Sequence, residues 1–230
     1  MYEGKSKILQ PCADDNTLIM HYKDYATSLN GKCREEIHGK GKINAAISNL
    51  IFRYLEKNNV ETHLIEAIDE TSAAVKKAEI IMVEVIVRNL AAGSFCKKYG
   101  VPEGQRLKNT VLEFCVKSDQ LDDPPINISQ ITAIGLATQS ELAELMQQAL
   151  IINGLLCELF TRAGLQLVDF KLEFGKIGGK IILCDEISPD SCRLWDIKTG
   201  DKMDKDRFRL NLGGLLDSYK DVLRRLENVV

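Results

Sequence analysis

The sequence predicts an α+β fold with two lobes: an N-terminal lobe built mainly from antiparallel strands, a larger mixed α/β lobe, and a cleft between them. Strand-like runs rich in Ile and Val dominate the N-terminal third, at residues 6–9, 17–22, 61–68 and 78–88. Beyond residue 89, helical repeats alternate with strand patterns. We therefore expect one unit at residues 1–83 and a second at 84–230, which meet near Met82 to Glu84.

One helix interrupts the N-terminal strands. It is entered through Gly39, Lys40 and Gly41, and Asn58 and Asn59 can end it. Its apolar residues recur at helical spacing, namely Ile43, Ala46, Ile47, Leu50, Ile51, Tyr54 and Leu55.

The second unit is expected to hold one long helix among shorter elements. Thr138 and Glu141 form a capping-box signature for this helix, which Gly164 ends. A short helix is expected from about Ser94, and the stretch holding Pro102, Pro124 and Pro125 is expected to be irregular. Strands are predicted at 166–174 and 180–186, and a closing helix at 215–226.

Composition limits the possible functions of the chain. It has 230 residues with 45% hydrophobic and 27% charged side chains, which is ordinary for a soluble globular protein. A net charge of −3 supplies no broad cationic field, so neither nucleic-acid nor membrane-surface binding is expected. The seven cysteines form no CxxC pair, which indicates free, mostly buried thiols in a reducing cytoplasm. Three scattered histidines make a zinc site improbable.

The segment LCDEISPDSCRLWD, residues 183–196, contains four carboxylates, one arginine and the only tryptophan of the chain. Asp185 and Glu186 continue directly from the apolar run Ile181 to Leu183, so charge begins where a buried strand ends. That placement predicts a functional site rather than a solvated surface. Trp195 is expected to anchor this segment by packing.

Polar and apolar residues alternate strictly from Leu167 to Phe174, which places Asp169, Lys171 and Glu173 on one strand face. A three-residue loop at 178–180 would oppose Glu173 to Asp185 across a hairpin. Two opposed carboxylates repel unless a cation lies between them, and two carboxylates plus substrate phosphates are the usual ligands of Mg²⁺. An ordinary solvent-facing strand ladder is the alternative.

Two basic segments could contact phosphate. In YEGKSK, Lys5 and Lys7 have the two-residue spacing of a strand and lie beside a glycine that lets the backbone approach a ligand. The alternative is that they are solvated charges on an edge strand. The Gly39-Lys40-Gly41 segment before the helix offers free backbone N–H groups and a second lysine to an anion. A flexible start of the helix would explain that segment equally well.

A second group of residues could hold a sugar phosphate. Arg88 lies at a strand end, and Ser94 follows at a helix start. Together they can bind a phosphate through the planar guanidinium of Arg88 and the hydroxyl of Ser94. The alternative is a structural salt bridge from Arg88. Asp190 and Arg193 can pair with each other or contact a sugar and a phosphate. Sequence spacing does not separate these alternatives.

Several blocks together resemble one known family. They are YEGKSK, VEVIVRNLAAGS at 83–94, LVDFKLEFG at 167–175, DEISPDSCRLWD at 185–196 and DKDRFR at 204–209, with the following LGG. The chain resembles the phosphoribosylaminoimidazole-succinocarboxamide synthase (SAICAR synthetase) family from end to end. One departure is Asn30 beside Gly31, where family members often carry an acidic residue.

The resemblance implies an ATP-dependent ligase of purine biosynthesis. The enzyme would join the carboxylate of 5-aminoimidazole-4-carboxylate ribonucleotide (CAIR) to the amine of L-aspartate, giving SAICAR, ADP and phosphate. The smaller lobe would be a nucleotide-binding lobe similar to that of protein kinases, although Lys171 follows Asp169-Phe170 where kinases have glycine and no HRD sequence is present. A cytoplasmic homodimer with small-molecule substrates is expected.

The resemblance also implies roles for individual residues. Asp169 and Lys171 would line the reacting centre, and Glu173 and Asp185 would hold Mg²⁺. Lys40 is expected among the nucleotide contacts because of its place at the helix start, and not from the resemblance. The remaining ATP contacts would be Lys5, Lys7, Glu84, Lys117 and Asp123, and the ribotide contacts would be Arg88, Ser94, Asp190 and Arg193.

Chemical reasoning adds the expected reaction course. A carboxylate is a poor electrophile until its oxygen becomes a leaving group, so we expect ATP to phosphorylate CAIR and the aspartate amine to attack the acyl phosphate. The sequence indicates no base for the aspartate ammonium. A small-molecule kinase and a nucleotide sensor without turnover are the alternative functions.

Overall fold

The computed structural model describes residues 1–28, 31 and 33–230. The predicted departure at Asn30 lies outside these residues. The helices and strands are, in chain order, β1 (Tyr2–Glu3), β2 (Lys7–Pro11), β3 (Thr17–Tyr22), β4 (Tyr25–Ser28), β5 (Cys33–Glu36), α1 (Lys40–Lys57), β6 (Leu64–Ala67), β7 (Ser72–Lys76), β8 (Glu79–Leu90), α2 (Ser94–Tyr99), β9 (Arg106–Val116), the 3₁₀ helix η1 (Asp119–Leu121), β10 (Pro125–Ile126), α3 (Ile128–Ala133), α4 (Gln139–Arg162), β11 (Leu165–Ile177), β12 (Lys180–Cys184), β13 (Cys192–Asp196), α5 (Asp206–Arg209) and α6 (Leu215–Glu227).

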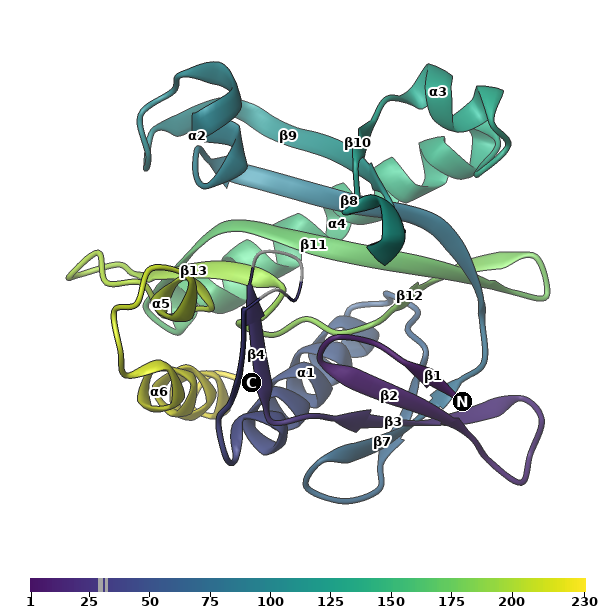
Figure 1. Cartoon of the computed structure of the whole chain (residues 1–230), viewed down its shortest axis with the longest axis horizontal. Helices are drawn as coiled ribbons and strands as arrows, with labels where there is room; N and C mark the ends of the chain where they lie inside the picture. The colour runs from purple at the N-terminus through teal and green to yellow at the C-terminus, as the bar shows by residue number, and fades with distance from the viewer. Residues whose placement is uncertain (29–30, 32) are drawn as a thin grey trace.

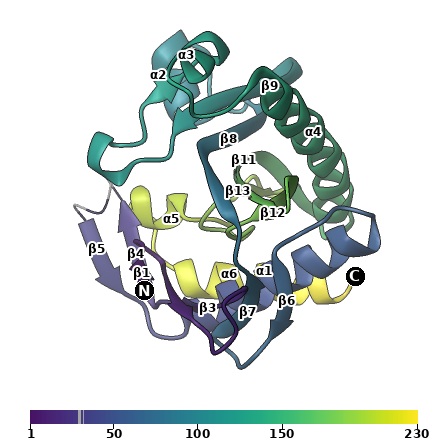
Figure 2. The same ribbon diagram turned by 90° about the vertical axis from the view of Figure 1, so that its right-hand side faces the viewer.

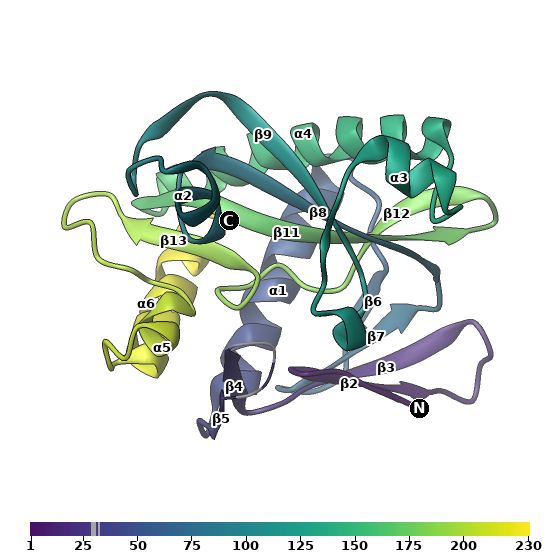
Figure 3. The ribbon, with the colours of Figure 1, turned by 45° about the horizontal axis from the view of Figure 1, so that its top comes forward.

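Two antiparallel sheets form the framework. The first has the strand order β1-β2-β3-β7-β6, and the second has the order β10-β9-β8-β11-β12, with β13 also paired to β11. Figure 1 shows the first sheet below the second, and Figure 3 shows the segment between β9 and β10 reaching toward β2. The chain passes from β7 of the first sheet to β8 of the second (Figure 2), and the expected meeting point near residue 83 falls inside β8. The division into units 1–83 and 84–230 stays a prediction.

Helix α4 covers one face of the second sheet. It begins at the predicted capping box, in which the Thr138 hydroxyl accepts from the Glu141 N–H and the Glu141 carboxylate accepts from the Thr138 N–H. The helix is long and apolar enough to cross a membrane, but Leu145, Ile152 and Leu156 on its inner face are completely buried in the core. It is therefore a core helix of this fold.

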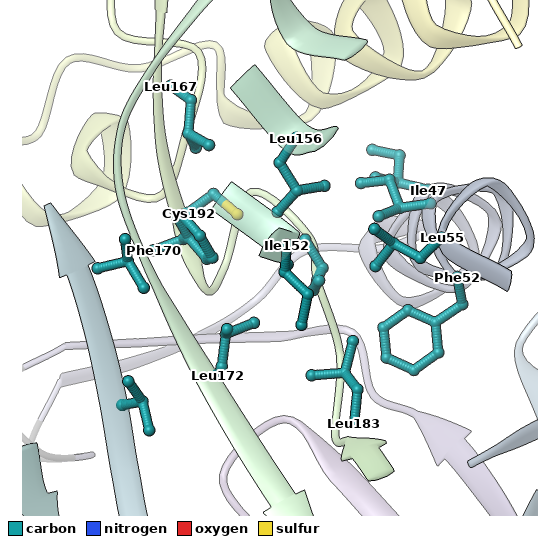
Figure 4. Close-up of a cluster of buried hydrophobic side chains, with 14 of the residues drawn as sticks. Ile47, Phe52, Leu55, Ile152, Leu156, Leu167, Phe170, Leu172, Leu183 and Cys192 are labelled. Carbon is teal, nitrogen blue, oxygen red and sulfur yellow. The ribbon is translucent and has the colours of Figure 1, made fainter. Parts of the chain in front are cut away.

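The hydrophobic core joins the two halves of the chain. Figure 4 shows Ile47, Phe52 and Leu55 of α1 facing the same interior as Ile152 and Leu156 of α4. The remaining labelled residues there are Leu167, Phe170, Leu172, Leu183 and Cys192. Helix α6 packs beside α1 (Figure 2), so the closing helix secures an element of the N-terminal third.

Several strands were not predicted from the sequence, among them buried β7 and half-exposed β9. The largest is β9, which occupies most of the stretch expected to be irregular. Its residues are mostly half exposed rather than alternating between core and solvent, so their hydrophobic pattern is weak, and the prolines lie outside the strand. The cysteines are free, as predicted, but only Cys184 and Cys192 are buried.

The predicted register of the β11–β12 hairpin is wrong. The turn contains two residues, Gly178 and Gly179, with φ of 58° and 83°. Ile177 therefore opposes Lys180, and Glu173 opposes Cys184 instead of Asp185. Two successive residues with positive φ match the right-handed twist of the flanking strands, which explains why the two-residue turn replaces the expected three-residue loop.

Candidate active site

Two adjoining cavities lie where the N-terminal sheet faces β8 and β11. The first, of about 710 Å³, is lined by residues of β1, β2, β8 and β11 and by the segment at 117–123. The second, of about 590 Å³, is lined by Arg88, Ser94, Asp169 and Arg193, among others. Lys171 and Asp190 belong to both walls, so the two cavities adjoin, and together they form the cleft. The cleft brings together all the predicted site residues except Lys40.

The first cavity carries a lysine held by two carboxylates. Lys7 Nζ lies 2.5 Å from Asp185 Oδ1 and 2.7 Å from Glu186 Oε1, and its side chain is only 12% exposed. Burial opposes the ammonium, but Asp185 and Glu186 outweigh it and raise the pKa of Lys7 well above its usual value. Lys7 is thus charged, and the alternative of a solvated edge lysine is wrong for this residue.

Asp185 reaches the cavity despite the corrected register. Strand β12 ends at Cys184, and Asp185 takes a left-handed backbone conformation with φ of 63°. A non-glycine residue with positive φ is uncommon, and aspartate is one of the residue types that adopt this conformation most readily. The local turn therefore does what strand pairing was expected to do, and directs Asp185 into the cavity that Glu173 also lines.

Lysines surround this acidic pair. Glu173 Oε2 lies 2.7 Å from Lys117 Nζ and Glu173 Oε1 lies 2.7 Å from Lys171 Nζ, which also lies 2.6 Å from Glu84 Oε1. Burial raises the pKa of Asp185, but Lys7, Lys171 and Lys117 lower it further and keep the carboxylate ionised. The described residues contain no cluster of three metal-ligating side chains.

The carboxylates of Glu173 and Asp185 fit Mg²⁺ as a donor set. This ion prefers oxygen ligands and often takes only one or two carboxylates together with substrate phosphates. Two carboxylates without a third ligand therefore suit an ion that arrives with a nucleotide better than one held permanently by the protein.

Two arginines converge on one buried carboxylate in the second cavity. Arg88 Nη1 lies 2.7 Å from Asp169 Oδ2, and Arg193 Nη1 lies 2.9 Å from the same oxygen. Arg88 also donates to Ser94 Oγ at 3.1 Å and pairs with Glu113, and Arg193 Nε donates to Asp206 Oδ2 at 2.8 Å. Burial raises the pKa of Asp169, although both arginines oppose that shift.

This arrangement fixes the orientation of two guanidinium groups that both line the second cavity. Arg88 takes part in the structural salt bridge considered as an alternative and also lines the cavity. Arg193 does not pair with Asp190, so that alternative is wrong: Asp190 accepts from Tyr219 Oη at 2.8 Å and pairs with Lys40.

Comparison with known proteins identifies the family. A protein-family model described as SAICAR synthetase matches residues 1–226. The phosphoribosylaminoimidazole-succinocarboxamide synthase of Latilactobacillus sakei is 51% identical over 230 residues, which cover 100% of this chain and 95% of that protein. The chain belongs to the SAICAR synthetase family.

Solved SAICAR synthetases share the whole fold. The crystal structure of phosphoribosylaminoimidazole-succinocarboxamide synthase from Ehrlichia chaffeensis has a TM-score of 0.97 at 41% identity, with 100% of this chain and 98% of that chain covered. A SAICAR synthetase in complex with ADP has a TM-score of 0.95 at 41% identity, with 98% and 96% covered. The predicted two-lobed fold class is confirmed, and the protein is a carbon–nitrogen ligase of purine biosynthesis.

Lys40 is the predicted residue that the SAICAR synthetase cleft leaves out. Its side chain is 1% exposed and pairs with Asp190 behind the cleft wall. The backbone N–H groups of Gly39 and Gly41, expected to be free for phosphate, donate to the Asp24 carboxylate at 3.0 and 2.8 Å. The Asp24 carboxylate therefore takes the place at this helix start where a phosphate was expected. A direct contact of Lys40 with ATP stays a prediction.

Several residues of the SAICAR synthetase cleft were not singled out from the sequence. Glu186 was noted only as charge after a strand, and it binds Lys7. Asp206 and Lys205 belong to the DKDRFR block, which was matched to the family without a role for either residue. Asp206 holds Arg193, and Lys205 lines both cavities. The charge density of that block was the available signal, but spacing could not show which side chains face the cleft.

Trp195 packs as predicted beside a small apolar cluster of Leu90, Ala92 and Val168. Lys202 Nζ lies 4.7 Å from the centre of its indole ring. Trp195 thereby anchors β13, the strand that carries Arg193.

Proposed function

We propose that the protein condenses the carboxylate of CAIR with the amine of L-aspartate at the expense of ATP, giving SAICAR, ADP and phosphate. The observation that carries this proposal is the cleft, in which a cavity lined by lysines and carboxylates adjoins a cavity lined by two arginines. Family membership and the fold shared with a SAICAR synthetase bound to ADP support the use of ATP.

The first cavity is the proposed nucleotide site. Lys5, Lys7 and Lys117 supply positive charge for the phosphates, and Asp123 and Glu84 lie on the same wall. Lys5 Nζ lies 2.8 Å from Asp119 Oδ1, which ties the N-terminal strand to the segment after β9 around the space that ATP would enter.

Glu173 and Asp185 would hold Mg²⁺ in this cavity. The ion would neutralise charge on the phosphoryl oxygens of ATP when bound.

The second cavity is the proposed ribotide site. Arg88, Ser94 and Arg193 would bind the phosphate of CAIR, and Asp190 would accept from the ribose hydroxyls. Lys40 would support the ribose contact indirectly, because its ion pair fixes the position of the Asp190 carboxylate.

Residues at the junction would serve the reacting groups. A carboxylate oxygen of CAIR would attack the terminal phosphorus of ATP, ADP would leave, and an acyl phosphate would form. Lys171 lies on the wall common to both cavities and would stabilise the charge that develops on the transferred phosphoryl group. Asp169 would keep both arginines aligned while the ribotide is held for the transfer.

We expect the enzyme to act as a cytoplasmic homodimer with units 1–83 and 84–230 closing around its substrates. Seven free thiols support a reducing compartment. Sedimentation of the purified protein tests the dimer.

The decisive experiment is ADP release by the purified protein with MgATP and CAIR, with and without L-aspartate, together with the product mass. ADP formation that depends on aspartate and matches the succinocarboxamide mass is the expected result. ADP without aspartate would favour a small-molecule kinase, and nucleotide binding without ADP release would favour a sensor.

A further inference from the structure

Lys205 differs from the other titratable groups at the junction of the two cavities. The groups that line both cavities are Lys5, Glu84, Asp123, Lys171, Asp190 and Lys205. Lys5 pairs with Asp123, Lys171 with Glu84, and Asp190 with Lys40. Within the described part of the chain, Lys205 Nζ has no carboxylate within ion-pair distance, and its hydrogen bond goes to Thr27 Oγ1 at 3.4 Å.

Burial makes this isolation significant. Three lysines in the described residues are buried, and two of them, Lys23 and Lys40, are ion-paired. Lys205 is equally buried, at 9% exposure, without such a pair. A buried ammonium without a carboxylate partner is costly, and a lysine can avoid that cost by losing its proton.

The charged groups that act on Lys205 come from three neighbouring segments. Asp190 and Glu186 lie in the segment between β12 and β13 and favour the ammonium, whereas Lys40 of α1 and Arg209 of α5 disfavour it. Asp190 is already shared with Lys40 and Tyr219. Burial is the strongest influence and lowers the pKa of Lys205 to about 8, so an appreciable fraction is neutral near pH 7.

The proposed reaction needs such a group. L-Aspartate enters at neutral pH with an α-ammonium group, which has no lone pair and cannot attack an acyl phosphate. The carboxylates at the junction are already engaged, because Glu84, Asp123 and Asp190 are each held in an ion pair by a lysine. We propose that Lys205 is the general base that removes a proton from the α-ammonium of L-aspartate.

This proton transfer rests on the proposed function. Neutral Lys205 Nζ takes one proton from the ammonium, and the freed lone pair forms the bond to the acyl carbon. The bond between that carbon and the phosphate oxygen breaks, phosphate leaves with the electron pair, and a second nitrogen proton leaves with phosphate as HPO₄²⁻. The amide keeps the third proton, and Lys205 returns its proton to solvent.

The test compares two nucleophiles in one enzyme. Hydroxylamine is largely uncharged at neutral pH and traps an acyl phosphate as a hydroxamate without a base, whereas aspartate needs one. In Lys205→Arg, which keeps the charge but cannot deprotonate, kcat/KM for aspartate should fall by ~100-fold or more, while hydroxamate formation from MgATP and CAIR stays within ~3-fold of wild type. Lys205→Ala should regain SAICAR formation with added methylamine, as quantified by product mass.

The pH dependence gives a second readout. The wild-type kcat/KM for aspartate should rise to a plateau with an apparent pKa near 8. The plateau should vanish in Lys205→Arg, because the rate then follows the small fraction of free aspartate amine. Lys198→Ala, which removes an exposed lysine from the segment after β13 and outside both cavities, should match wild type in both assays.

Three outcomes would overturn the inference. Full aspartate coupling in Lys205→Arg would show that only charge is needed. An equal loss of SAICAR and hydroxamate in a folded variant would place Lys205 in acyl phosphate formation. Absence of hydroxamate with the wild-type enzyme would instead overturn the acyl phosphate of the proposed function, and the inference with it.

Discussion

Arg193→Lys tests the proposed ribotide site most directly. The Arg193 guanidinium spans two carboxylates, with Nη1 2.9 Å from Asp169 Oδ2 and Nε 2.8 Å from Asp206 Oδ2. A lysine ammonium is a point charge on a flexible stem and cannot reproduce this planar fork. The substitution should therefore remove one of the two ion pairs and misalign the group that faces the ribotide phosphate.

The structure sets the expected size of both effects. One charge-assisted hydrogen bond contributes about 1.5–3 kcal/mol, and the Arg193 side chain is only 18% exposed, so solvent screening is limited. In a chain of this length, each kcal/mol lost from the free energy of unfolding lowers Tm by about 2–4 °C. The substitution should therefore lower Tm by roughly 3–12 °C. Loss of one phosphate contact predicts a KM for CAIR higher by ~10-fold, or about 1.4 kcal/mol, with the KM for ATP nearly unchanged.

Arg225→Lys is the matched control. Arg225 also spans two carboxylates, with Nη1 2.8 Å from Asp196 Oδ2 and Nε 2.7 Å from Asp221 Oδ2, but it lies outside both cavities. Thermal unfolding and steady-state kinetics of both variants separate stability from binding. Arg225→Lys should lower Tm without altering the KM for CAIR. A selective loss of ATP affinity in Arg193→Lys, or an equal rise of the KM for CAIR in both variants, would refute the assignment of Arg193.

Three further predictions follow from single residues. Asp185→Asn should lower Mg²⁺-dependent turnover by orders of magnitude while the circular dichroism spectrum stays native; unchanged activity at limiting Mg²⁺ would contradict the metal assignment. Gly93→Ala should raise the KM for CAIR and lower the free energy of unfolding in urea by about 1–3 kcal/mol, because Gly93 has φ of 55° and an added Cβ would lie 2.7 Å from Arg193 Cζ; native values for both would show that the backbone and guanidinium can shift freely. The Thr199 N–H holds the pKa of Asp196 down, to about 2, so its stabilisation is present above the unfolded pKa and is lost as pH falls from about 4 toward 2. The stability advantage of wild type over Asp196→Asn in urea unfolding should shrink over that range, and a constant advantage would exclude this linkage.

Local sequence patterns identified most of the helices. The Thr138 capping box and the apolar repeat of α1 are both present, because a helix is decided by neighbours three and four residues apart. Strand β11 was also visible, since the alternation from Leu167 to Phe174 requires only the two-residue period of a strand. Half-exposed β9 lacked that signal and was missed.

The resemblance carried by a few charged blocks led to many of the charged residues that line the cleft. It could not show how these residues pair. Spacing left Asp190 and Arg193 as possible partners, but Asp190 pairs with Lys40 and Arg193 with Asp169 and Asp206. Such contacts join segments distant in sequence, and their geometry depends on how the sheets pack.

The sequence by itself determined the family, the helical core and the chemical character of the cleft, because these depend on residue type and short-range spacing. Only the tertiary structure decided the hairpin register, the direction of the Asp185 side chain and the isolation of Lys205. The physical reason is that turn conformation fixes register, and burial with distant partners fixes the charge state of a side chain.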